Sequence, residues 1–117
     1  MRYLKSHLIG VDQGSELLFS DFQDGGAMWT GQGKREYRRT CQFKHPFATP
    51  PTLQVSMSMW DMDRRANQRA DLSAENVTAE GFDIVFRTWG DTRIARVRAD
   101  WMAIGPVEGD EDDWALY

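Results

Sequence analysis

The sequence predicts an all-β protein, a small antiparallel β-sandwich or barrel built from about six short strands. Apolar and polar residues alternate with a period of two in several runs, and the 10 glycines and 4 prolines concentrate between those runs. Helical periodicity is nowhere sustained over the roughly 11 residues that would indicate an amphipathic helix. A chain of 117 residues has the length of one domain and can bury a core without disulfide bonds.

Three runs show the strand pattern most clearly, over residues 53–59, 82–88 and 92–104. Pro50 and Pro51 give the first run an extended entry. The second and third runs each alternate apolar with polar side chains, the apolar sets being Phe82, Ile84 and Phe86, and Ala95, Val97, Ala99 and Trp101. The short connection at 89–91 favours an antiparallel hairpin between them. Weaker strand candidates cover 16–19, 35–43 and 70–78, and the polar stretch 61–68 reads as a loop.

The chain divides into an N-terminal strand and loop segment (1–34) of the same domain, a β-sandwich core (35–107) and an acidic tail (108–117). The tail contains five acidic residues, Glu108, Asp110, Glu111, Asp112 and Asp113. The residues that follow them, Trp114, Leu116 and Tyr117, are compatible with a docking peptide, with packing on a neighbour or with disorder.

Charge and hydropathy exclude several classes of protein. The net charge is -4 and the pI about 5.1, which argues against a general nucleic-acid binder. No apolar run approaches the roughly 18 residues of a membrane helix, so we expect no membrane insertion. The first residues lack the apolar stretch of a secretory signal, so we expect a cytoplasmic protein, with release by lysis or a leaderless route left open.

The residues offer no catalytic or metal-binding arrangement, and we therefore expect no enzyme, no catalytic residue, no metal and no cofactor. Cys41 is the only cysteine, so the chain can form no internal disulfide, and we expect this thiol to be buried and reduced. His7 and His45 have no nucleophile beside them in the sequence. The spacing of Asp61 and Asp63 suggests a calcium loop, but two arginines follow where further acidic ligands are needed. The sequon that begins at Asn76 is expected to be an edge or turn asparagine.

The remaining polar and aromatic residues suit a neutral sugar. Planar side chains such as those of Arg, Asp, Asn and Gln can hydrogen-bond to adjacent hydroxyls, and an aromatic face can cover the C–H side of a sugar ring. Trp89, Gly90 and Asp91 lie together on one expected loop tip, where binding residues are common.

The stretch 43–104 resembles the H-type lectin domain, the family of the snail agglutinins and the slime-mould discoidins. The matching residues are, in order, Phe43-x3-Phe47-x2-Pro50-Pro51, Leu53-x-Val55, Asp61, Arg69, Asn76-Val77-Thr78, Gly81-Phe82, Thr88-Trp89-x-x-Thr92 and Trp101-x-Ala103-Ile104. The resemblance implies a six-stranded antiparallel lectin-like β-sandwich that assembles into homotrimers, sometimes paired into hexamers. It also implies galactose or N-acetylgalactosamine-type ligands bound without metal, and a role in cell adhesion.

Carried over by position, the resemblance implies a set of sugar-binding residues. The family's arginine falls on Arg69 and its aromatic residue on Trp89. Gly90 replaces a histidine, with Asp91 beside it, and Gln32 stands where the family has an aspartate, with Asp24 as the nearby substitute. An alternative for Arg69 is a structural ion pair with Asp61 or Asp71 at a subunit boundary.

Two functions therefore follow from the sequence. One is a multivalent carbohydrate-binding module. The other is a structural building block, such as a trimeric component of a phage-like particle, that retains the lectin fold without binding sugar.

Overall fold

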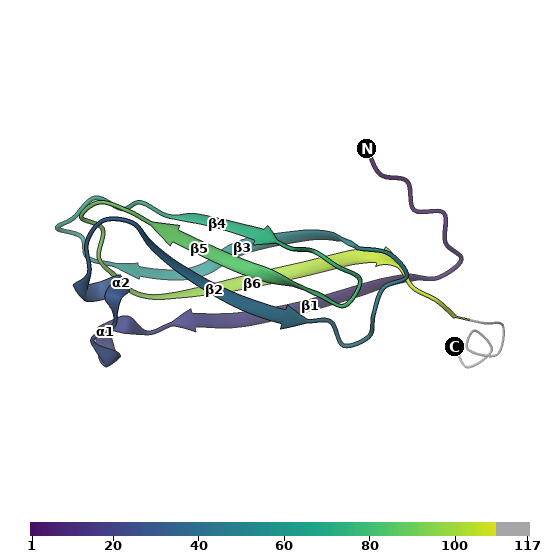
Figure 1. The fold of residues 1–117 in the computed structure, drawn as a ribbon, viewed down its shortest axis with the longest axis horizontal. Helices are drawn as coiled ribbons and strands as arrows, with labels where there is room; N and C mark the ends of the chain where they lie inside the picture. Colours follow the sequence, from purple (N-terminus) through teal and green to yellow (C-terminus); the bar gives the residue numbers. More distant parts are fainter. Residues whose placement is uncertain (110–117) are drawn as a thin grey trace.

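The computed structural model describes residues 1–109 and shows two three-stranded antiparallel sheets packed face to face (Figure 1). One sheet has the order β1-β6-β3 and the other the order β2-β5-β4. The all-β prediction of a six-stranded antiparallel sandwich is confirmed. The strands are β1 Ile9–Phe19, β2 Arg35–Gln42, β3 Thr52–Met62, β4 Asp71–Glu75, β5 Gly81–Thr88 and β6 Ile94–Pro106, and two short helices are α1 Asp21–Asp24 and α2 Ala27–Thr30.

The core lies between the two central strands, β5 and β6, as their alternation predicts. Phe82, Ile84 and Phe86 point inward from β5 and are fully buried or nearly so. Val97 and Ala99 meet them from β6, together with Trp101, Ala103 and several aromatic side chains of the flanking segments. Burying this many large apolar groups is the main force that holds the sheets together.

Cys41 lies in this core, as expected, and is a free thiol. Burial raises the pKa of the Cys41 thiol to about 11, because removal from water disfavours the thiolate. The side chain therefore behaves as a small apolar residue at neutral pH.

The connection at 89–91 does not form the expected hairpin. Strand β5 pairs with β2 and β4, whereas β6 pairs with β1 and β3, so the chain crosses from one sheet to the other at this point. The prediction was wrong because both strands are central. Each already has a partner on both edges and leaves no edge for the other.

Two strands are longer than predicted. Strand β1 begins at Ile9 rather than at residue 16, because Gly10 and Gly14 interrupt the apolar pattern that marks a strand. Gly14 is required there, since an added Cβ would lie 2.6 Å from the indole Nε1 of Trp101. Strand β3 continues to Met62, into the predicted loop, because register shifts on both sides of the segment 59–61 disturb the period-two pattern.

The elements that could carry a binding site gather at one end of the sandwich (Figure 1). The crossing from β5 to β6, the β3–β4 loop, the two helices and the start of β2 lie at this end. The N-terminus and the end of β6 lie toward the other end. Neither described helix is long and apolar enough to span a membrane. The expectations for Asp110 and the later tail residues fall outside the described part of the chain.

Candidate functional site

Two buried threonines fasten the β5–β6 crossing to the segment that precedes β4. The hydroxyl of Thr88 donates to the carbonyl of Arg69 at 2.6 Å, and the hydroxyl of Thr92 donates to the carbonyl of Asn67 at 2.5 Å. The backbone N–H of Arg69 donates in turn to the Thr92 hydroxyl at 3.1 Å. Because both threonines are almost completely buried, these bonds hold two segments of distant sequence in a fixed relation.

This arrangement places Arg69 against Asp91. Nη1 of Arg69 lies 2.5 Å from Oδ1 of Asp91, and the hydrogen bond from Arg69 is the main reason that the pKa of Asp91 is lowered. Within the chain, Arg69 therefore pairs with Asp91 rather than with Asp61 or Asp71. Asp61 lies 3.4 Å from Arg96, in another ion pair.

Gly90 allows the guanidinium to lie close to the crossing. Its backbone has a φ of 70°, which an L side chain rarely adopts. An added Cβ would lie 3.0 Å from Nη1 of Arg69. The carbonyl of Gly90 accepts hydrogen bonds from the N–H of Gly33 at 2.9 Å and from Nη2 of Arg35 at 3.2 Å.

The other predicted site residues, Trp89, Gln32 and Asp24, differ in how they are linked to the Arg69–Asp91 pair. Trp89 precedes Gly90 and is 43% exposed. Gln32 is exposed and precedes Gly33, so the hydrogen bond from Gly33 keeps its segment beside the crossing. Asp24 ends α1 at the same end of the molecule, but no hydrogen bond or ion pair joins its side chain to another described residue. The structure thus brings Arg69, Gly90 and Asp91 into contact and leaves Asp24 apart.

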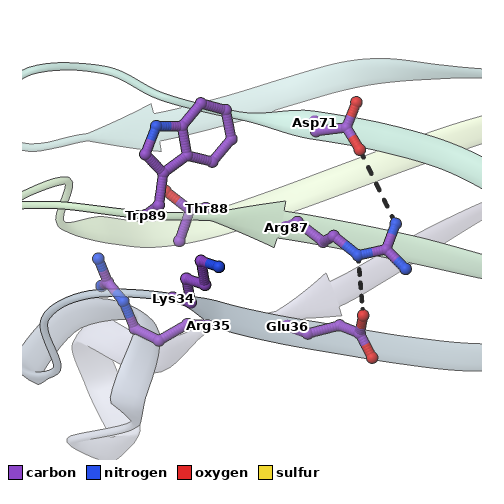
Figure 2. Close-up of a pocket in the computed structure, with 7 residues that line it drawn as sticks. All are labelled: Lys34, Arg35, Glu36, Asp71, Arg87, Thr88 and Trp89. Atoms are coloured by element: carbon purple, nitrogen blue, oxygen red, sulfur yellow. Dashed lines mark hydrogen bonds and ion pairs between the residues drawn. The ribbon is translucent and has the colours of Figure 1, made fainter.

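A cavity of about 550 Å³ lies beside Trp89, on the outer face of the β2-β5-β4 sheet (Figure 2). In the strand register, Glu36, Arg87 and Asp71 form one row across this face. Nε of Arg87 donates to Glu36 at 2.9 Å, and its Nη1 lies 3.9 Å from a carboxylate oxygen of Asp71. Lys34 and Trp89 line the same cavity.

The sequence prediction of the site did not include this cavity. Arg87 alternates with apolar residues and is readily placed on the outer face, but only the register of three strands brings it between Glu36 and Asp71. An outward arginine flanked by acidic residues on separate strands is not a local sequence signal.

The model of the H-type lectin domain family matches residues 38–104. This chain belongs to the H-type lectin domain family. The match covers more than half of the chain and includes Arg69, Trp89, Gly90 and Asp91, whereas Gln32 and Asp24 precede it.

Several relatives resemble this H-type lectin domain protein. It is 64% identical over 108 residues to the product named ATP synthase subunits region ORF 7 of Fuscovulum blasticum, covering 92% of this chain and 93% of that one. It is 37% identical over 81 residues to a discoidin-1 polypeptide of Dictyostelium discoideum, covering 68% of this chain. It spans only 32% of the length of that discoidin-1 polypeptide.

Solved structures share the fold of this H-type lectin domain. Discoidin II of Dictyostelium discoideum superposes with a TM-score of 0.71 at 22% identity, covering 90% of this chain and 40% of the other. The tailspike protein gp49 of Pseudomonas phage LKA1 gives a TM-score of 0.52 at 12% identity, covering 86% of this chain and 15% of the tailspike chain. At these identities the likeness concerns the fold alone.

Proposed function

We propose that the protein is a non-enzymatic carbohydrate-binding module for galactose, N-acetylgalactosamine or related glycans. The observation that carries the proposal is the Arg69–Asp91 pair next to the exposed indole of Trp89, at one end of a lectin fold. Gln32 belongs to the proposed site through its neighbour Gly33, and Asp24 is its outlying member.

The proposed contacts follow from the hydrogen-bonding capacity of the pair. The guanidinium of Arg69 has five N–H donors, and only the Nη1 group has a partner among the described residues. Its Nε and Nη2 groups can therefore donate to adjacent hydroxyls of a sugar. Asp91 remains exposed and can accept from a hydroxyl, while Trp89 covers the C–H side of the ring.

Such a site would be weak alone, and we propose that it acts within an assembly of identical chains. One end of the outer face of the β1-β6-β3 sheet carries an apolar stripe that an assembly could cover. The stripe is short: the exposed Ile9 and Val11 of β1 lie opposite Pro106 and Ile104 of β6, and Met102 of β6 is exposed on the same face. A homotrimer packed through this face would bury the stripe, and several sites on one particle can raise avidity by about 10²–10⁴-fold.

The same stripe also favours the second candidate function. A structural building block needs the assembly face but not the sugar, and Gly90 and Gln32 depart from the residues expected of the family at a sugar site. In that case a stable oligomer would form and no saccharide would bind.

Replacing Arg69 separates the two functions. We expect Arg69→Ala to abolish binding on a glycan array and on galactose-agarose, while light scattering shows the wild-type oligomer. Arg2→Ala is the matched control, because Arg2 contacts Thr49 and Pro50 before β3, at the other end of the molecule. Failure of the wild-type protein to bind any neutral saccharide while remaining oligomeric would favour the structural function. Loss of the oligomer in Arg69→Ala would instead assign Arg69 to an interface between protomers.

A further inference from the structure

The cavity beside Trp89 combines an open aromatic side chain with polar groups that retain hydrogen-bonding capacity. The Trp89 side chain stands on the outer face of the sheet (Figure 2). Within residues 1–109 its indole has no ring contact and its N–H no hydrogen-bond partner. At about 550 Å³, the cavity lies within the usual range for small-ligand sites, roughly 300–1,000 Å³.

The floor of the cavity is held in place by charge pairing. Arg87 donates to Glu36 at 2.9 Å and forms an ion pair with Glu75 at 2.9 Å, so its guanidinium is fixed and its charge is offset. Arg35, which also lines the cavity, directs its guanidinium at the backbone carbonyls of Met28, Gly33 and Gly90. The N–H groups of both arginines are therefore largely occupied by partners within the protein.

Two lining groups remain available. Lys34 has no hydrogen bond or ion pair with any residue of the described range, and its ammonium can donate. The carboxylate of Asp71 is 57% exposed and has only the long 3.9 Å contact with Arg87, so it can accept. The three cationic and two acidic side chains that line the cavity nearly balance in charge. One free donor and one free acceptor beside an indole therefore suit a neutral polyhydroxylated ring.

We infer that this cavity is a second saccharide subsite, which binds a further neutral sugar unit of the glycan whose first unit contacts Arg69 and Asp91. Trp89 belongs to both sites, because it lies two residues before Asp91 in the chain and its side chain lines the cavity. This inference rests on the proposed function and makes the preferred ligand an oligosaccharide rather than a single sugar.

Affinity as a function of glycan length tests the second subsite. Titration calorimetry would compare galactose and N-acetylgalactosamine with neutral di- and trisaccharides that carry them at the non-reducing end. We expect the wild-type protein to bind at least one of these longer sugars about 10-fold more tightly than the corresponding monosaccharide, as one further charge-assisted hydrogen bond and a ring contact would give.

Variants of the lining residues test whether the gain in affinity for the longer sugar comes from the cavity. Lys34→Gln and Asp71→Asn should each reduce the affinity for that longer sugar toward the monosaccharide value and leave monosaccharide affinity unchanged. Lys5→Gln and Glu80→Gln are the controls, because both residues are exposed and neither contributes to the cavity. Both controls should retain the full gain.

Three results would overturn the subsite. These are equal affinity for long and short sugars, a gain that survives both cavity variants, and tighter binding of a trisaccharide that carries a carboxylate. If the monosaccharide still binds through Arg69, only the subsite fails. If the wild-type protein binds no saccharide of any length, the proposed function fails with it.

Discussion

Gly90 is the residue at which backbone and binding chemistry depend most directly on each other. Its φ of 70° and the 3.0 Å separation between a hypothetical Cβ and Nη1 of Arg69 leave no room for a side chain unless the guanidinium moves. The family's histidine would add a hydrogen-bonding ring at this position. This chain instead brings the guanidinium of Arg69 over the crossing.

Gly90→Ala should therefore affect both stability and binding. We expect a loss of about 1 kcal/mol from the unfavourable backbone conformation, and weaker sugar binding because the Arg69 side chain must move. Gly25→Ala is the matched control, because Gly25 has a φ of 67° but open space around its Cβ. Urea unfolding should show a similar loss in both variants, and sugar titration a loss in Gly90→Ala alone. Unchanged sugar affinity in Gly90→Ala would contradict the proposed position of Arg69.

The candidate site residues could be predicted singly from the sequence, but their pairing could not. The sequence predicts Arg69 and Asp91 as site residues, but the carboxylates of Asp61 and Asp71 are equally plausible partners of Arg69 from the sequence. The hydroxyls of Thr88 and Thr92 decide among them by fixing the segment 67–69 against the crossing. A threonine in a strand pattern gives no sign that its hydroxyl will serve this purpose.

At the scale of elements, the central strands were predictable and the connections were not. Strands β5 and β6 bury one complete face, so their alternation is plain in the sequence. Edge strand β1 contains glycines that fit against larger side chains, and β3 contains register shifts. A short connection suggests a hairpin only if both strands have a free edge, and strand order cannot be read from alternation.

The elements at the site end are joined by a cluster around Arg93, which precedes β6. Arg93 donates to the carbonyl of Trp29 in α2 at 3.0 Å, and its guanidinium lies 4.3 Å from the centre of the Trp29 ring. It also lies 3.4 Å from Asp63, which follows β3 and pairs with Arg65 at 3.0 Å. The cluster therefore links α2, β3 and β6.

Asp63→Asn should destabilise the protein in a pH-dependent way. The hydrogen bond from Arg65 is the main reason that the pKa of Asp63 falls from 3.8 to about 2. A lowered carboxyl pKa stabilises the fold fully above the ordinary pKa, and the contribution is lost as the pH falls through the folded value. The difference in unfolding free energy between wild type and variant should be constant above about pH 5 and shrink toward pH 2.

The same Asp63→Asn change made in an Arg65→Ala variant identifies the cause of this pH dependence. In Arg65→Ala, the further change Asp63→Asn should show a smaller pH dependence, because the principal hydrogen bond is already absent and only the backbone N–H of residue 65 and Arg93 still lower the pKa of Asp63. Denaturant titrations between pH 2 and 6 would measure all four proteins. An undiminished dependence in the Arg65→Ala background would assign the effect to Arg93 or to another group.

At the scale of the whole molecule, the two outer faces differ in character. The face of the β2-β5-β4 sheet carries ion pairs around Arg38 and Arg87, whereas the other face carries the apolar stripe. The charged face suits water, and the apolar stripe at one end of the other face is the surface that assembly would cover.

Val11→Asp should dissociate the proposed trimer without unfolding the chain, because it places an unpaired charge within the apolar stripe. Light scattering would measure the oligomer and circular dichroism the fold. Gln42→Asp is the control, since Gln42 is exposed on β2 of the other sheet. A Val11→Asp oligomer of wild-type size would show that this face is not the interface.

The elongated shape of the molecule, 58 × 28 × 18 Å, has a consequence for how such an assembly would meet its target. The proposed sugar contacts lie at one tip of the long axis (Figure 1). If three copies pack in parallel through the outer faces of their β1-β6-β3 sheets, the site ends of all three point in the same direction. A single trimer would then bind one glycan-coated surface and could not cross-link two. Agglutination of particles would require two trimers joined through the ends opposite their sugar sites.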